Sequence, residues 1–233
     1  MIIQMNYFFV ITPFILQKAI WPISRFTFRF FCNLKILGTE NLSNLNGPLI
    51  FAANHTSELD PFIPATCLPF FSKFVPMFCA TKGKEFYDES GFRQIFYGGL
   101  LFKLIGGQQV YSGNKDYEKS LVNHINLLNL GYSDLIFPEG GITKTGQITA
   151  AKGGIAYLAE KTNSPIIPIG ISGLYKISFS DLLLRRRKVI VSFGKAILQD
   201  ELKQNVVKNG EDRINNYKME ADYIMNKISS LIV

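Results

Sequence analysis

A histidine and an aspartate five residues apart, His55 and Asp60, are the residue pair in this sequence best suited to catalysis. A carboxylate beside an imidazole fixes the tautomer of the ring and stabilises the cation that forms on proton uptake, so the pair can act as a general base. Residues at this spacing do not share a helix face, because an α-helix has 3.6 residues per turn. The chain must therefore turn between them.

The flanking residues indicate where that turn lies. The apolar run 48–53 is typical of a buried strand, and the segment 61–64 is the expected start of a helix. His55 would then end the strand and Asp60 would begin the helix. The alternative is structural: an aspartate before Pro61 is also typical of a helix N-cap followed by a proline at the first helical position.

A second apolar strand ends in an exposed acid at 135–141, with the sequence L-I-F-P-E-G-G. Gly140 and Gly141 let the backbone approach a substrate closely, so their N–H groups are candidates for stabilising a developing oxyanion. The alternative is a tight turn that needs glycine because its φ angle is positive.

The motif N-H-x-x-x-x-D, followed about eighty residues later by F-P-E-G, resembles the glycerophospholipid acyltransferase family of the PlsC type. The resemblance extends from about residue 34 to residue 197. It implies that His55 and Asp60 are the catalytic pair, and that the histidine takes the proton from an acceptor hydroxyl that attacks an acyl thioester. It also implies that Asn54 positions groups beside the base, and that Glu139 and Gly140 hold the acceptor head group.

Two further segments extend the resemblance. The segment 151–156 resembles the lysine-glycine helix start of the family, and 165–173 resembles its fourth motif, an apolar strand ending in glycine. Lys152 at a helix N-terminus would add positive charge to an anion site. The alternative is a solvated lysine that precedes a helix.

Two positions depart from the family pattern. The family usually has an arginine shortly after the strand near residue 110 and another two residues after F-P-E-G, where this sequence has Ser112 and Ile142. A guanidinium binds phosphate with two parallel hydrogen bonds, whereas lysine acts as a point charge. Without these arginines a phosphorylated acceptor is not expected to bind well, unless Lys115, Lys144 or Lys152 replaces them.

The composition favours a membrane surface as partner. The 233 residues suffice for one domain, alone or with a terminal extension. Hydrophobic residues make up 47% of the chain and charged residues 18%, below the roughly 25% charged of an ordinary soluble domain. The net charge is +7. An apolar and basic chain suits an anionic membrane surface, and because no nucleic-acid motif is present, a nucleic-acid partner is not expected.

The first 32 residues are predicted to form one or two helices lying in the membrane interface, kinked at prolines, with basic residues facing the head groups. The segment lacks the basic start and cleavage site of a signal peptide. Pro13, Lys18 and Pro22 interrupt the run of about 20 apolar residues that a spanning helix needs. The alternative is a helix buried against the domain. We thus expect a membrane-interface segment at 1–32 and an acyltransferase α/β domain at 33–233.

From residue 33 onward, strands alternate with helices, which predicts an α/β fold with a mixed, largely parallel sheet flanked by helices. The expected strands are 34–37, 49–53, 75–80, 108–111, 134–137, 164–171 and 188–193. The expected helices are 63–71, 91–105, 116–130, 153–162 and 212–232.

The remaining reactive residue types have structural interpretations. Cys32, Cys67 and Cys79 form no C-x-x-C pair, which favours reduced thiols in a protein that faces the cytosol, and the last two are expected in the core. His124 has no acidic residue four positions away, so we expect it at the surface or half-buried. With two histidines and no clustered ligands, no metal site is expected. The basic run 185–188 is expected to be a solvated loop, with an anionic lipid contact as the alternative.

The sequence therefore predicts a membrane-associated O-acyltransferase at the cytoplasmic face, acting in phospholipid biosynthesis. It would move a fatty acyl group from acyl-CoA or acyl-ACP to a hydroxyl of a lysophospholipid such as 1-acylglycerol-3-phosphate. The thioester is a co-substrate, and no bound cofactor is expected. No G-x-S-x-G serine is present, which favours direct transfer. The alternatives are another lipid acceptor (another lysolipid, an amino lipid or a glycolipid) and a weakly catalytic lipid-binding protein.

Overall fold

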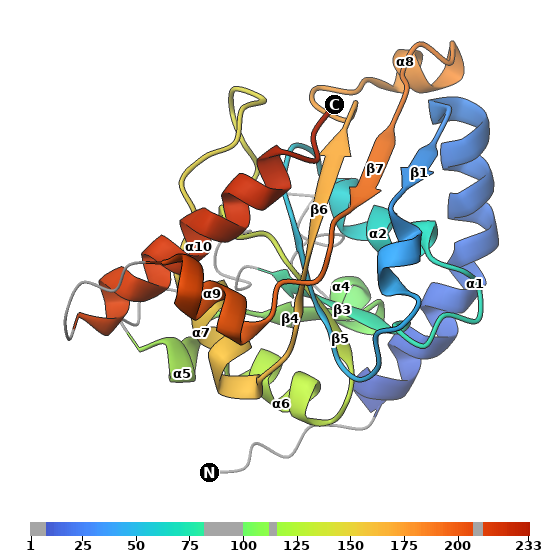
Figure 1. The fold of residues 1–233 in the computed structure, drawn as a ribbon. Coiled ribbons are helices and arrows are strands. Elements are labelled where there is room, and N and C mark those ends of the chain that lie inside the picture. The colour runs from blue at the N-terminus through green and yellow to red at the C-terminus, as the bar shows by residue number, and fades with distance from the viewer. Residues whose placement is uncertain (1–7, 82–99, 112–115, 207–211) are drawn as a thin grey trace.

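Seven strands form one mixed sheet at the centre of the protein, in the order β1-β7-β6-β2-β5-β3-β4 (Figure 1). The structure is a computed structural model that describes residues 8–81, 100–111, 116–206 and 212–233. The β6 and β7 strands pair antiparallel and the other neighbours pair parallel, which confirms the predicted mixed, largely parallel sheet. The strands are β1 (Lys35–Leu37), β2 (Ile50–Ala53), β3 (Met77–Thr81), β4 (Gly107–Gln109), β5 (Ser133–Ile136), β6 (Ile166–Ser172) and β7 (Ile190–Phe193).

Helices cover both faces of the sheet, because its central strands are buried on both sides. In β2, Phe51 and Ala53 point into the core shared with α1 and α2, whereas Ile50 and Ala52 point into the core shared with α6, α7 and α10. The helices are α1 (Phe8–Cys32), α2 (Ile63–Cys67), α4 (Leu100–Leu104), α5 (Tyr117–Ser120), α6 (Val122–Asn129), α7 (Gly154–Thr162), α8 (Phe179–Leu183), α9 (Gln199–Asn205) and α10 (Arg213–Ser229), with 3-10 turns η1 (Thr39–Leu42) and η2 (Asp60–Phe62).

The parallel strands β2, β5 and β6 bring their carboxyl ends to one edge of the sheet. In open α/β sheets, ligands bind outside the carboxyl ends of the strands. Both motifs found in the sequence follow these ends, the first after β2 and the second after β5. The topology therefore gathers the predicted site at this edge.

In the amino-terminal segment predicted at 1–32, residues 8–32 form one continuous helix, α1, which passes through Pro13 and Pro22, and residues 1–7 lie outside the described residues. Its inner face belongs to the core, where Phe28 and Cys32 are buried. The Gln17 side chain ties it to the rest of the fold: Nε2 donates to the carbonyls of Met77 (2.7 Å) and Ile105 (2.8 Å), and Oε1 accepts from the Met77 N–H (3.0 Å). Helix α1 is thus packed as part of the α/β domain, as the alternative for this segment expected.

The outer face of α1 is apolar and open to solvent. Five of its large apolar residues are more than half exposed, namely Phe8, Ile11, Ile15, Ile23 and Phe26. Among the described helices, none has both the length and the apolar character that crossing a membrane would require. The helix therefore has a packed face and an exposed apolar face along the same length.

Several element boundaries differ from the sequence prediction. The helix expected at 63–71 ends at Cys67, because Leu68 precedes a proline and takes an extended conformation. The helix expected at 116–130 is divided into α5 and α6, and Gly131 ends it with a φ of 90°. Most of the helix expected at 91–105 lies outside the described residues. The short elements η1, α8 and α9 were not predicted, because their few residues show no clear period.

The prediction for His124 is wrong, because this side chain is fully buried. Its Nδ1 atom lies 2.6 Å from Oδ2 of Asp134, which is also fully buried. The partner lies ten residues further on, in β5, so a search four positions along the helix could not find it.

Two of the three cysteines lie in the core. Cys32 and Cys67 are buried, and Cys79 is partly buried and packs against the same core. All three are free thiols, and burial raises the pKa of Cys67 to about 12. A thiol that rarely ionises is a poor nucleophile, so Cys67 acts as a core residue, as predicted.

Candidate active site

His55 lies just beyond the end of β2, and the chain then turns so that Asp60 begins η2. The two side chains meet with His55 Nδ1 3.0 Å from Asp60 Oδ2. The carboxyl group is fully buried, and the imidazole is 14% exposed. The predicted turn between the two residues is confirmed, and it leaves the ring accessible at the edge of the sheet.

Backbone groups orient the Asp60 carboxylate. Its Oδ2 atom accepts hydrogen bonds from the N–H groups of Thr56 (2.5 Å) and Ser57 (2.8 Å), which precede it in the chain. A helix N-cap would accept from residues that follow it, so the N-cap alternative does not describe how this side chain is used. The same oxygen faces His55 Nδ1, which places the ring proton on Nδ1 and leaves Nε2 as the basic atom.

Phe137 packs against one face of the imidazole ring. The two rings stack with centroids 4.0 Å apart and an angle of 17° between their planes. Phe137 directly follows β5, so the second motif supports the first. The stack fixes the plane of the ring and the hydrogen bond to Asp60 fixes its rotation. Together they preorganise the base.

Glu139 joins the two motif loops. Its side chain is buried, and Oε1 accepts a hydrogen bond from the His55 backbone N–H (2.8 Å). Oε2 accepts from the N–H (2.9 Å) and the hydroxyl (2.8 Å) of Thr149. In return, the His55 carbonyl accepts from the Thr143 N–H (2.8 Å). Both carboxylate oxygens therefore bind the protein itself, and one of them sets the position of the His55 backbone.

Asn54 has a comparable backbone role. It is 1% exposed, and its side-chain amide donates to the Ile171 carbonyl (2.9 Å) and accepts from the Ile171 N–H (2.8 Å). These bonds continue the pairing of β2 with β6 by one residue through a side chain. Asn54 thereby fixes the point at which the catalytic loop leaves the sheet.

The glycine turn after β5 lies beside a lysine. Gly140 has a φ of 72°, so the positive φ expected for this turn is confirmed, and its N–H donates to the Phe137 carbonyl (2.9 Å). A Cβ atom at Gly140 would lie 2.7 Å from Nζ of Lys152, which shows that the lysine side chain crosses the turn. Lys152 is exposed and precedes α7. The turn thus carries a positive charge at the edge where His55 lies.

The predicted positions group as follows. Seven of the expected site residues surround the ends of β2 and β5: Asn54, His55, Asp60, Glu139, Gly140, Gly141 and Lys152. Ile142 lies in the same turn with 43% of its side chain exposed. Lys144 is exposed nearby, and its carbonyl accepts from the Tyr175 hydroxyl (2.7 Å). Ser112 and Lys115 lie outside the described residues.

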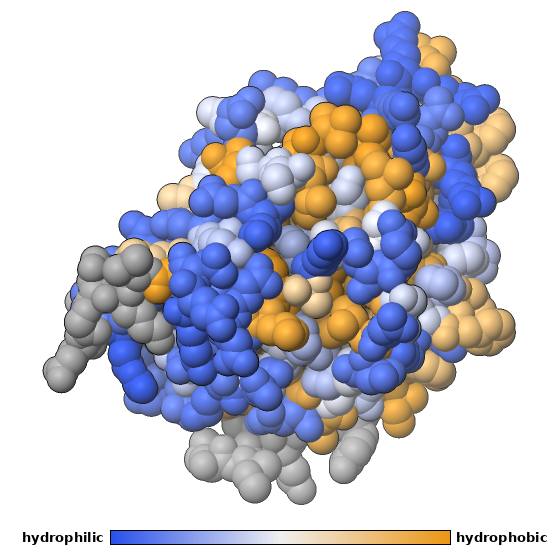
Figure 2. All heavy atoms as spheres, viewed as in Figure 1, coloured by the Kyte–Doolittle hydropathy of each residue, from blue (hydrophilic) through white to orange (hydrophobic). Residues whose placement is uncertain are grey.

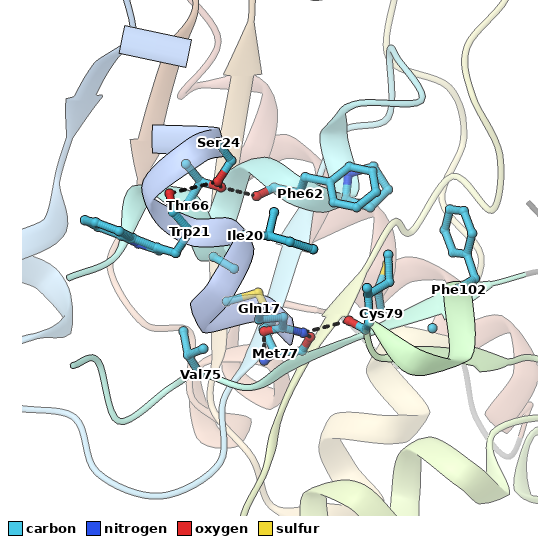
Figure 3. A pocket seen from close by; sticks show the side chains of 14 residues that line it. Gln17, Ile20, Trp21, Ser24, Phe62, Thr66, Val75, Met77, Cys79 and Phe102 are labelled. Carbon is cyan, nitrogen blue, oxygen red and sulfur yellow. Dashed lines mark hydrogen bonds between the residues drawn. The ribbon is translucent and has the colours of Figure 1, made fainter. Parts of the chain in front are cut away.

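A mostly apolar pocket of about 60 Å³ lies between α1 and the segment that follows Asp60 (Figure 3). Pro61 and Phe62 line it, and Ile20 and Trp21 reach it from α1. Its polar groups are engaged in the protein, as with the Ser24 hydroxyl, which lies 3.0 Å from that of Thr66. Sequence reasoning missed this pocket, because its walls come from segments forty residues apart.

Comparisons with known proteins show what this chain is similar to. A family model described as Acyltransferase matches residues 33–172. The chain is 28% identical over 170 residues to a chloroplastic 1-acyl-sn-glycerol-3-phosphate acyltransferase of Arabidopsis thaliana. This match covers 72% of this chain and 44% of the relative. It is 25% identical over 175 residues to the 1-acyl-sn-glycerol-3-phosphate acyltransferase of Cocos nucifera, with 74% and 51% covered. The chain thus spans about half the length of these curated relatives.

A solved structure has the same fold. The crystal structure of the 1-acyl-sn-glycerophosphate acyltransferase PlsC from Thermotoga maritima superposes with a TM-score of 0.61 at 19% identity, covering 93% of this chain and 79% of that one. The matched family region contains the loop of His55 and Asp60, the glycine turn and the lysine before α7. This chain therefore belongs to the glycerophospholipid acyltransferase family of the PlsC type.

Proposed function

We propose that this protein transfers a fatty acyl group from an acyl thioester to a hydroxyl of a lysophospholipid such as 1-acylglycerol-3-phosphate. The observation that carries the proposal is the preorganised pair of His55 and Asp60, joined at 3.0 Å at the carboxyl edge of the sheet. Its curated relatives are named for acylation of 1-acyl-sn-glycerol-3-phosphate. Binding alone does not need a buried carboxylate aimed at an accessible imidazole.

In the proposed reaction, the acceptor hydroxyl oxygen attacks the thioester carbonyl carbon while Nε2 of His55 takes its proton. Asp60 stabilises the imidazolium that forms. The carbon–sulfur bond then breaks, and the leaving sulfur takes the proton back from Nε2. The products are an ester and a free thiol. No acyl-enzyme forms, and the base returns to its starting state.

The transient oxyanion needs a donor near the turn after β5. The N–H of Gly140 already binds the Phe137 carbonyl, so it is not the proposed donor. The Gly141 N–H and the Lys152 ammonium are the candidates in this turn. Lys152 also offers a positive charge to an acceptor phosphate beside the base, at the turn where Ile142 replaces the arginine usual in the family.

We propose that the protein works at a membrane surface, attached through the outer face of α1. The exposed isoleucines and phenylalanines of this face suit the boundary between head groups and acyl chains. Lys18 Nζ lies 4.4 Å from the centre of the Phe14 ring, so positive charge accompanies the apolar residues. The apolar pocket between α1 and Phe62 is lined by Pro61, which directly follows Asp60, so it is the proposed place for part of an acyl chain near the catalytic pair. The free thiols are in keeping with a cytoplasmic location.

The acyl group would arrive on coenzyme A or on acyl carrier protein, and both present it as a thioester. The experiment that tests the function is turnover of labelled acyl-CoA and acyl-ACP by the purified full chain, with 1-acylglycerol-3-phosphate among a panel of lysolipids. Ester formation that needs His55 is expected. Absence of ester with every acceptor and both donors would overturn the proposal.

A second candidate acceptor is a neutral lysolipid, an amino lipid or a glycolipid. The side chain of Ile142, 43% exposed in the glycine turn, favours this reading because it offers no hydrogen bond to phosphate. The same acceptor panel separates the two cases, because the acylated lipid identifies the acceptor.

A further inference from the structure

The connection between β6 and β7 displays apolar side chains and positive charge in one place. Helix α8 lies in this connection, and Phe179, Leu183 and Leu184 at its surface are 75%, 55% and 59% exposed. Residues 176–188 contain one acid, Asp181, and five basic residues: Lys176, Arg185, Arg186, Arg187 and Lys188. The exposed apolar side chains therefore belong to α8 and its end, and the basic residues lie on either side of the helix in the chain.

This display is built into the structure. Ser178 and Asp181 form a capping box at the start of α8. Arg187 donates to Oδ2 of Asp181 from Nε (3.1 Å) and Nη2 (3.0 Å), so the acid is already engaged within the segment. Leu182 packs against the core, which fixes the helix in place. Ordered contacts on the inner side thus hold Phe179 and its neighbours out in water.

The segment lies at the catalytic edge of the sheet, since β6 runs parallel to β2 and α8 follows its carboxyl end. It also lies against the end of α1, where the Arg185 guanidinium carbon is 4.6 Å from the centre of the Phe30 ring. Figure 1 shows α8 beyond the ends of β6 and β7, beside the last turn of α1. Figure 2 shows apolar side chains along the edge formed by α1 and hydrophilic ones around α8. The apolar face of α1 and the basic residues that follow α8 thus lie side by side.

We propose that α8 and the basic residues 185–188 form a second membrane contact, whose partner is the anionic phospholipid surface. The proposal rests on the proposed function, in which α1 already lies on the membrane. Phe179 and Leu183 would enter the head-group boundary, and Arg185 and Arg186 would bind lipid phosphates. One helix lying in an interface leaves the protein free to roll about the helix axis. A second contact at the catalytic edge removes that freedom and turns the site toward the bilayer.

The charge contribution is tested with vesicles of phosphatidylcholine alone and of phosphatidylcholine mixed with phosphatidylglycerol. In the full chain, Arg185→Gln together with Arg186→Gln is expected to weaken binding to the mixed vesicles by about 30-fold. Binding to phosphatidylcholine alone is expected to stay the same. The control is Lys195→Gln with Lys203→Gln, which removes two exposed lysines at the opposite edge of the sheet.

The apolar contribution is tested by Phe179→Ser with Leu183→Ser. We expect weaker binding to both kinds of vesicle and slower transfer to an acceptor embedded in them, with unchanged transfer between detergent-dispersed substrates. The control is Leu130→Ser with Leu198→Ser, which alters leucines of similar exposure at the opposite edge. Circular dichroism of each variant verifies that these surface changes leave the fold intact.

Each outcome decides between the proposals. If both α8 variants bind vesicles as their controls do, while Ile15→Ser with Ile23→Ser releases the protein, the second contact is refuted and attachment through α1 stands. Such a result would point to an acidic protein surface as the partner of α8. If the α1 variant also stays bound, both membrane proposals fail. Absent turnover of detergent-dispersed substrates by the unaltered chain refutes the catalytic proposal by itself, whatever the binding results.

Discussion

Three groups converge on one Asp60 oxygen: the His55 imidazole and the N–H groups of Thr56 and Ser57. The N–H groups hold the carboxylate in the direction that fixes the ring tautomer. The ring itself is clamped by Phe137. At the scale of residues, the His55 ring, which is the proposed base, is therefore oriented by contacts that exist before any substrate binds, as efficient general base catalysis requires.

His55→Ala is expected to abolish acyl transfer while the fold stays intact. The ring is partly exposed, and its loss removes no core contact except the stack on Phe137. Asp60→Asn is expected to slow the reaction by roughly two to four orders of magnitude, because an amide no longer secures the proton on Nδ1. Single-turnover rates with a saturating thioester measure both effects. Near-normal turnover by the alanine variant would contradict His55 as the base.

Glu139→Gln separates positioning from acceptor binding. The carboxylate accepts hydrogen bonds on both oxygens, and an amide has only one accepting oxygen, so either the His55 N–H or Thr149 loses its partner. A positioning role predicts a lower kcat with an unchanged KM for the acceptor, and a loss of stability of roughly 1–3 kcal/mol. Steady-state kinetics and denaturant unfolding measure these quantities.

The matched control for Glu139 is Thr149→Val, which leaves the His55 contact in place and removes only the hydroxyl that donates to Oε2. It should lower stability by about 1 kcal/mol with a smaller effect on kcat. A raised acceptor KM at unchanged kcat in the glutamine variant would instead assign Glu139 to the acceptor head group.

At the scale of elements, a second histidine–aspartate pair joins α6 to β5 far from solvent. His124 and Asp134 are both fully buried, and His124 Nε2 and Asp134 Oδ1 have no partner among the described residues. No substrate reaches a pair without exposure, so this one serves the fold. Removing one member of a buried pair lowers the free energy of unfolding more than replacing both members with apolar residues, because the remaining member is left without its partner.

Asp134→Ala is therefore expected to lower the free energy of unfolding by about 3–5 kcal/mol, with the kcat of the remaining folded enzyme little changed. His124→Leu combined with Asp134→Leu should recover most of that loss, because two apolar groups replace the pair. Urea unfolding of the single and double variants measures the difference. A double variant less stable than the single one would argue that the pair itself stabilises the fold.

Helix α1 is an element with two roles. Its inner face contributes Phe28 and Cys32 to the core. The three hydrogen bonds of Gln17 hold it to β3 and to the residue that follows α4. Removing the helix would open that core, so its outer face is better probed by surface substitutions such as those at Ile15 and Ile23. The same packing places the exposed apolar face at a fixed angle to the catalytic edge.

At the scale of the whole molecule, the described positive charge at the carboxyl edge of the sheet includes Lys144 and Lys152 near the glycine turn and the basic residues beyond α8. The proposed acceptor would approach this edge. In the proposed function, the exposed Ile142 of this turn offers an acceptor phosphate no hydrogen bond. Hydrogen bonds to charged groups are each worth roughly 1.5–3 kcal/mol, so the missing arginine is a large loss unless lysine replaces it.

Ile142→Arg is thus expected to lower the KM for 1-acylglycerol-3-phosphate about tenfold or more, with no gain for a neutral lysolipid. Lys152→Ala is expected to raise the same KM. Initial rates against paired charged and neutral acceptors measure the selectivity, and Ile142→Lys tests whether a point charge is sufficient. If neither substitution changes the KM for the phosphorylated acceptor, the phosphate is not bound at this turn.

The sequence alone determined the chain order of the strands, the mixed sheet and the residues of both motifs. These features depend on local patterns: apolar runs such as 48–53 form buried strands, and glycine at 140 permits a positive φ. The spacing of His55 and Asp60 also required a turn, which is a constraint of helix geometry. Local physics was sufficient for each of these features.

The tertiary structure alone decided which side chains meet across long stretches of chain. Glu139 proved to bind the backbone of His55, and His124 found its partner in a strand ten residues away. Likewise, α1 and α8 lie together although about 150 residues separate them. Such contacts depend on strand order and crossover connections, because these bring distant segments to one edge. No pattern within a single segment records them.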